Sequence, residues 1–297
     1  MNEIIWSALA RAQKLYPVDV CGLNFERNHG HLALMVQNPE MVPLFIGYVK
    51  QETAQAINHL LGRRRRTVWA EDYDSPTVLD SDKALEKIAY LLLNPVKDNQ
   101  ASSLDEYPGV SSWKLFKGQD FTRKCRFFHR DDVPRLKNPH CPWLENKRVL
   151  EALDKDENSP VDFCLSPYVW KTCFEDTENL TDEQVRELIL ERIEAEARKL
   201  IEENKSKKLP TPKPEELQRQ SMLTPYVPKT FGKRMLCLSS IKELRVVFIA
   251  GYKRLRDKAE WVLSQWRLGN WLLPFPPGLF PPCLPRRANL LPDALWA

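Results

Sequence analysis

The stretch "VDVCGLNFERNHGHLALMV", residues 18–36, decides the fold of the first part of this chain. Its two mainly apolar runs predict two strands, and Asn28 and Gly30 between them favour a hairpin-like connection. Alternate residues of a strand project from the same face, so His29 and His31 can direct both imidazoles to one point. The stretch therefore predicts a hairpin that presents a pair of potential metal ligands.

Segments on both sides of the hairpin have the apolar spacing of helices. Residues 3–15 place their apolar side chains on one stripe. Residues 44–62 return to the same spacing and end in a glycine, a common C-cap. A third helix is expected from Asp80 or Ser81, both good N-cap residues, to about Pro95, because the residue before a proline disfavours helix.

The resulting order is helix, two strands, helix, a short extended segment at residues 68–79, and helix. This order predicts an α+β fold with a ferredoxin-like (RRM-like) layer, in which helices lie on one face of an antiparallel sheet. Such folds normally begin with a strand, whereas this chain begins at the helix, so we expect the first strand of the fold to be missing. A mainly helical C-terminal extension should follow.

The extension has several predicted parts. A basic, irregular segment leads to a helix that Thr181 and Gln184 open with a capping box. A second capping box, Ser240 with Glu243, precedes a helix that runs to about Gly269 and a proline-rich end expected to be extended. We predict four units: an N-terminal domain at 1–115, the irregular segment and accessory helix at 116–205, a lysine- and proline-rich linker at 206–232, and the long helix with its tail at 233–297.

Composition restricts the class of protein. The chain has 297 residues, 43% of them hydrophobic, which is enough for a sizeable core. No apolar run approaches the roughly 20 residues that cross a bilayer, and the N-terminus has no basic region typical of a signal peptide. Seven cysteines without regular spacing fit reduced thiols. We expect a cytoplasmic protein with no membrane partner.

The net charge of +4 does not by itself indicate nucleic acid, but the distribution of charge is uneven. Four consecutive arginines, Arg63, Arg64, Arg65 and Arg66, lie in the N-terminal part, and acidic residues gather after residue 181. The run is consistent with a polyanion contact and equally with a decorated loop. Trp69 either stacks on unpaired bases or packs in the core.

On the third predicted helix, Tyr90 and Asn94 are four residues apart and share a face. Taken alone, this pair is typical of a tyrosine beside the core and an asparagine that ends a helix before proline. The two histidines alone are equally typical of an exposed hairpin edge.

Taken together and in this order, the motifs resemble a family. The His-x-His on a strand, a helix, the segment "VWAEDY" and the late Tyr-x-x-x-Asn-Pro-Val are similar to the REP-associated tyrosine transposases, bacterial members of the HUH single-strand transposases and nucleases. The similarity extends through "DEYPGVSSW" and covers roughly residues 3–113. Two features depart from the family pattern: the first strand is absent, and Gly30 replaces a usually bulky apolar residue.

The resemblance implies roles for individual residues. His29, His31 and Asn94 would bind Mg²⁺ or Mn²⁺, and Tyr90 would be the nucleophile that forms a 5′-phosphotyrosine. The enzyme would cleave and rejoin single-stranded hairpin (REP-like) DNA, as a monomer or a homodimer. The DNA-binding residues would be Arg63, Arg64, Arg65, Arg66 and Trp69.

Two other classes of protein remain as alternatives. One is a catalytically degenerate single-stranded DNA-binding protein of the same family, which Gly30 and the absent strand favour. The other is an interaction protein that binds through the helices after residue 181. A zinc site is not expected, because Cys125, His129, His140 and Cys141 lack the usual ligand spacing.

Overall fold

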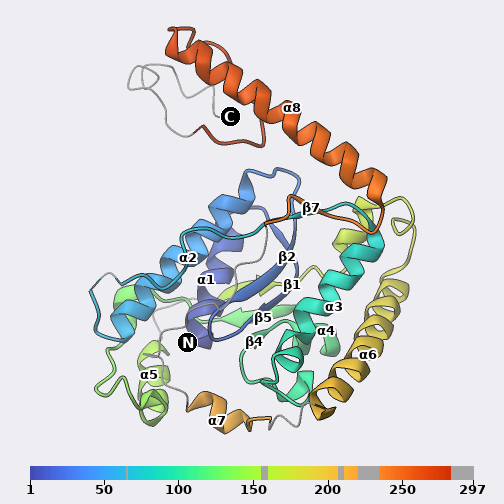
Figure 1. Cartoon of the computed structure of the whole chain (residues 1–297). Helices are drawn as coiled ribbons and strands as arrows, with labels where there is room; N and C mark the ends of the chain where they lie inside the picture. Colours follow the sequence, from blue (N-terminus) through green and yellow to red (C-terminus); the bar gives the residue numbers. More distant parts are fainter. Residues whose placement is uncertain (65, 155–159, 207–210, 220–233, 282–297) are drawn as a thin grey trace.

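The structure, a computed structural model, describes residues 1–297 except 65, 155–159, 207–210, 220–233 and 282–297 (Figure 1). It has the predicted α+β class. The described helices are α1 (Asn2–Leu15), α2 (Met41–Leu60), α3 (Ser81–Lys97), α4 (Trp113–Gly118), α5 (Asn146–Leu153), α6 (Asp182–Ser206), α7 (Pro214–Gln218) and α8 (Lys242–Arg267). The described strands are β1 (Asp19–Phe25), β2 (Gly30–Met35), β3 (Thr77–Val78), β4 (Val110–Ser111), β5 (Thr122–Cys125), β6 (Val161–Cys164) and β7 (Cys237–Leu238).

The predicted hairpin is present and forms the centre of the main sheet. In the described part of the chain this sheet has three strands in the order β2-β1-β4. Strands β1 and β2 pair antiparallel, with Phe25 opposite Gly30 at the turn end. On its other side β1 pairs antiparallel with β4, with Asn24 opposite Ser111. The turn end of β1 is therefore held by strands on both sides.

Both faces of β1 are covered, and the ferredoxin-like arrangement with helices on one face stays a prediction. On one face, a Cβ added to Gly22 would lie 3.3 Å from the side chain of Leu91 in α3. On the other face, Phe25 contacts the indole of Trp69, which donates a hydrogen bond to Thr53 of α2. The physical reason is that every residue of β1 after the first is buried. A strand that is apolar on both faces needs cover on both.

The short extended segment before α3 does not join the main sheet. Strand β3 pairs in parallel with β7, with Thr77 opposite Cys237, so a C-terminal segment lies beside the start of α3. Asp80 caps α3, as predicted, by accepting a hydrogen bond from the Lys83 N–H at 2.7 Å. The same carboxylate accepts a second bond, at 2.7 Å, from the N–H of Ser240.

The hydrophobic core extends across the expected boundary at residue 115. Strands β5 and β6 pair antiparallel, and α6 lies along α3 (Figure 1). One hydrophobic cluster joins buried residues of α1, β1 and α3 to others from the later part of the chain, among them Phe163, Trp170, Val185 and Ile189. The predicted capping box of Thr181 and Gln184 opens α6, with both reciprocal hydrogen bonds present.

The last long helix, α8, extends away from the rest of the described chain (Figure 1). The capping box predicted for Ser240 was wrong, because the Ser240 hydroxyl bonds to the Asp82 carboxylate at 3.0 Å and α8 begins after Ile241. Among the described residues, no helix combines the length and the apolar composition that crossing a bilayer requires.

Candidate metal and tyrosine site

The hairpin and α3 bring the four predicted residues together. Both histidines lie on the face of the hairpin that α3 covers, with their ring centroids 4.9 Å apart. The His31 ring lies edge-on to the ring of Tyr90, at a centroid distance of 5.8 Å. The Asn94 carboxamide is hydrogen-bonded to Nε2 of His29 at 2.8 Å. One strand end and one helix face therefore form a single cluster.

Helix α3 continues slightly past the predicted end near Pro95, and this adds a residue to the cluster. Proline in the last turn removes only one backbone hydrogen bond, so the helix runs on to Lys97. Lys97 is seven residues, or about two turns, after Tyr90, which places both on one face. Its ammonium group donates a hydrogen bond to the Tyr90 hydroxyl at 2.8 Å.

The orientation of His29 is fixed by its neighbour in the turn. Nδ1 of His29 lies 2.9 Å from the Oδ1 atom of Asn28, which can only accept, so Nδ1 carries the proton. The lone pair of Nε2 then points toward Asn94. Such a partner on the far nitrogen is what usually orients a metal-binding histidine.

Both imidazoles are held in the neutral form, which is the form that binds metal. Burial lowers the pKa of His29. Burial, followed by repulsion from His29 and Lys97, lowers the pKa of His31 to about 4.

Sequence reasoning missed two carboxylates at the site. Glu26 follows β1 and is only 7% exposed, and burial, assisted by the charge of Asp98, raises its pKa to about 7. One potential ligand atom each from Glu26, His29 and Asp98 lies within 4.8 Å of the others. Glu26 stands three residues before His29, but nothing in the sequence showed that Asp98 returns to it after the last turn of α3.

The residues present fit a divalent cation. Asn94 is 1% exposed, and its Oδ1 atom has no hydrogen-bond partner among the described residues. The other amide atom, Nδ2, lies 2.8 Å from Nε2 of His29, so the carboxamide and the imidazole meet at one place. Imidazole nitrogens with amide and carboxylate oxygens form a donor set suited to Mg²⁺ or Mn²⁺.

The glycine between the two histidines does not leave the strand unsupported. A Cβ at Gly30 would lie 2.5 Å from the ring of Phe25, which is the residue opposite it in β1. That ring therefore occupies the space that the family's bulky residue would use. The neighbouring strand thus supplies the packing at this position.

The predicted DNA-binding residues lie apart from this cluster. Arg64 and Arg66 are exposed, Arg63 is half-buried, and Arg65 lies outside the described residues. Trp69 is half-buried against Phe25, on the face of β1 opposite Tyr90. Its packing position agrees with the core alternative, and a role in stacking bases stays a prediction.

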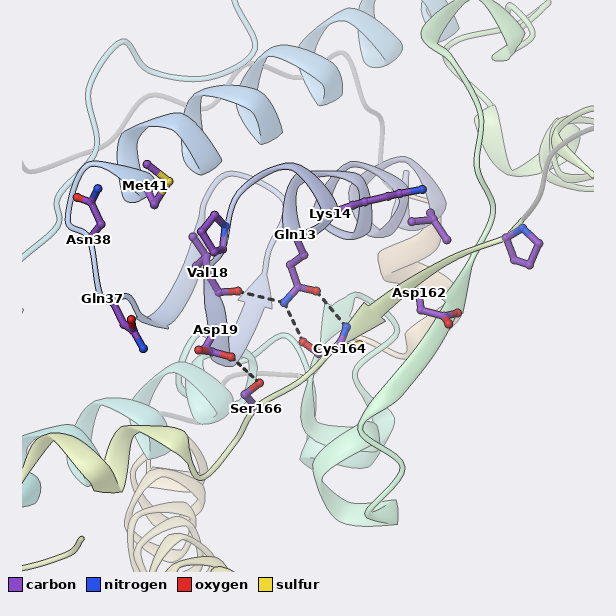
Figure 2. A pocket seen from close by; sticks show the side chains of 13 residues that line it. Gln13, Lys14, Val18, Asp19, Gln37, Asn38, Met41, Asp162, Cys164 and Ser166 are labelled. Carbon is purple, nitrogen blue, oxygen red and sulfur yellow. Dashed lines mark hydrogen bonds between the residues drawn. The ribbon is translucent and has the colours of Figure 1, made fainter. Parts of the chain in front are cut away.

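An open cavity of about 820 Å³ lies at the other end of β1 (Figure 2). Asp19 and Gln13 line it, together with Cys164. The Gln13 side chain accepts from the Cys164 N–H at 3.0 Å and donates to its carbonyl at 2.9 Å, as a neighbouring strand would. None of the four predicted site residues lines this cavity.

Within the described part of the chain, the group of Glu26, His29 and Asp98 is the one set of three or more His, Cys, Asp or Glu side chains with ligand spacing. In this part of the chain, the cysteines and histidines after residue 124 form no such group. Comparison of the chain with family models, curated proteins and solved structures finds no match. Functional inference therefore depends on the geometry of the cluster.

Proposed function

We propose that this chain is a metal-dependent DNA strand transferase and endonuclease of the HUH tyrosine transposase type, with a ferredoxin-like domain. The observation that carries the proposal is the meeting of Tyr90 with His31, and of His29 with Asn94, across the hairpin and α3. The two histidines lie far from Tyr90 and Asn94 in the sequence, so their convergence in one cluster supports a shared site. The substrate would be single-stranded DNA with a hairpin.

In this proposal His29, His31 and Asn94 hold Mg²⁺ or Mn²⁺, with Glu26 and Asp98 as further oxygen donors. The bound cation supplies charge stabilisation at the scissile phosphate. Asn28 keeps His29 in the tautomer whose Nε2 carries a lone pair, and a bound cation would take that lone pair in place of the hydrogen bond from Asn94. The two carboxylates reduce the net charge that the cation brings to the site.

Tyr90 supplies the nucleophile. Its hydroxyl oxygen attacks phosphorus, the new bond from oxygen to phosphorus forms, and the bond to the 3′-oxygen breaks. The phenol proton is lost to solvent, and the departing 3′-oxygen gains a proton to become a hydroxyl group. Because the phosphodiester energy is retained in the phosphotyrosine, attack by another 3′-hydroxyl rejoins DNA without ATP.

The exposed guanidinium groups of Arg64 and Arg66 would hold backbone phosphates at a distance from the reacting bond. They would position the hairpin without reading its sequence. A protein of the same family that binds DNA but does not cleave it is the alternative, and the following experiment separates the two.

Protein, Mn²⁺ and a labelled hairpin oligonucleotide are incubated and separated on a denaturing gel. We expect a covalent protein–DNA band that EDTA abolishes. Tyr90→Phe should remove the band while DNA binding is retained, and Tyr16→Phe, at the end of α1, is the matched control. Binding without an adduct, tested over a panel of hairpins, would instead support the non-catalytic alternative.

A further inference from the structure

The Tyr90 hydroxyl has a specific partner that the proposed chemistry has not yet used. Lys97 donates a hydrogen bond to it at 2.8 Å, and the same nitrogen lies 4.6 Å from the centre of the ring. The ammonium group therefore contacts the oxygen atom that would attack phosphorus. Both residues belong to α3, so the helical backbone fixes the geometry of this contact.

The Lys97 side chain ends in an ammonium group, a hydrogen-bond donor that carries positive charge at neutral pH. A permanent cation beside the phenol oxygen favours negative charge on that oxygen.

A second lysine provides an internal comparison. Lys87 lies 5.3 Å from the centre of the Tyr90 ring, but its ammonium group forms an ion pair with Glu86 at 2.9 Å. Lys87 and Lys97 thus bring similar charge to the ring, whereas the bond to the hydroxyl is seen for Lys97. A comparison of the two lysines separates a general effect of charge from the effect of the bond.

We propose that Lys97 is a positioning residue for Tyr90, which holds the phenol oxygen during attack and stabilises it as the leaving group during rejoining. The inference rests on the proposed function. In the forward step the phenol proton goes to solvent as the bond to phosphorus forms. In the reverse step the bond from phosphorus to the phenol oxygen breaks, and its electron pair returns to an oxygen paired with the ammonium group.

The kinetic test uses three variants: Lys97→Met, Lys97→Arg and Lys87→Met. Single-turnover rates of adduct formation and of rejoining are measured at saturating oligonucleotide, and affinity is measured separately by fluorescence anisotropy. A hydrogen bond to a charged group corresponds to a loss of about 10- to 150-fold in both rates for Lys97→Met. We expect affinity to change less than about threefold, Lys97→Arg to recover most of the rate, and Lys87→Met to stay close to wild type.

A second measurement does not need DNA or metal. An aryl sulfonyl fluoride reacts with nucleophilic phenols, and peptide mass spectrometry separates its addition to Tyr90 from addition to lysine. In metal-free protein we expect Lys97→Met to reduce labelling of Tyr90 about tenfold and Lys87→Met to leave it unchanged. Thermal unfolding checks that each variant is folded.

Equal effects of the two Met substitutions on rate and labelling would overturn the inference, because charge alone would then suffice. So would a Lys97→Met variant whose only defect is weaker DNA binding, since the lysine would then hold phosphate and not the phenol. If labelling depends on Lys97 but wild type forms no adduct with DNA, the coupling between the two residues stands and the proposed function fails.

Discussion

The ring of Phe25 occupies the space in which a side chain at residue 30 would lie. A Cβ added to Gly30 would come within 2.5 Å of that ring, closer than side chains approach in folded proteins. The two residues are directly opposite each other in β1 and β2. The glycine between the two histidines therefore leaves the room that this ring occupies.

This relationship predicts a compensating pair of substitutions. Gly30→Val should lower the free energy of unfolding by about 1–3 kcal/mol, because the added side chain overpacks the strand pair. Phe25→Ala alone removes a buried ring and should cost about 3–5 kcal/mol. The double variant should lose clearly less than the sum, as measured by urea denaturation. A strictly additive result would contradict the proposed contact.

The affinity for a divalent cation should depend on the proposed ligands and on Asn28, which orients His29. We expect His31→Ala to weaken Mn²⁺ binding, followed by electron paramagnetic resonance of the free ion, by at least about tenfold. Asn28→Ala should also weaken it, by about 10- to 100-fold, because the tautomer of His29 is no longer fixed. His59→Ala, which removes a histidine bonded to the Arg130 carbonyl, is the control. Unchanged affinity in both site variants would rule out this metal site.

The arginine run should control affinity for DNA and its dependence on salt. Each phosphate contact contributes about 0.9 to the slope of log affinity against log salt on duplex DNA and about 0.7 on single strands. Arg64→Ala with Arg66→Ala should weaken binding for all hairpin sequences and reduce the slope by about 1.4–1.8. Arg198→Ala, an exposed arginine on α6, is the control. A slope equal to that of wild type would place the DNA elsewhere.

The start of α3 should be sensitive to acid through Asp80. Burial alone would raise the pKa of this carboxyl, but hydrogen bonds from Ser239, Lys83 and Ser240 outweigh burial and lower the pKa below 3.8. A carboxyl whose folded pKa is lowered stabilises the protein above its unfolded pKa, and this stability is lost as the pH falls through the folded pKa.

Asp80→Asn should therefore reduce the stability of the protein at pH 6 and flatten its dependence on pH below 4. Asp80→Ala should cost about 1–2 kcal/mol, since the cap of α3 is also lost. Urea denaturation between pH 3 and 6 measures both effects, with Asp257→Asn on α8 as the control. Equal slopes for wild type and Asp80→Asn would show that the Asp80 cap does not carry the pH dependence.

Much of the local structure was predictable because it depends on neighbours in sequence. The two apolar runs of residues 18–36 predicted the hairpin, and the helical stripe of residues 3–15 predicted α1. Asp80 and Ser81 were both candidates for the cap of α3, and the structure assigns the cap to Asp80. Local spacing also aligns His29 with His31 on a strand and Tyr90 with Asn94 on a helix, but the family resemblance was needed to join the two pairs into one predicted site.

The sequence by itself thus determined the two local pairs, one on the hairpin and one on α3. The tertiary structure decided which other side chains lie beside each pair. The end of β1 brings Glu26 close to Asp98, and the last two residues of α3 bring Lys97 onto the face that carries Tyr90. The cover on both faces of β1 and the pairing of β3 with β7 arise in the same way. These contacts depend on burial and pairing between distant segments, which leave no periodic signal in the chain.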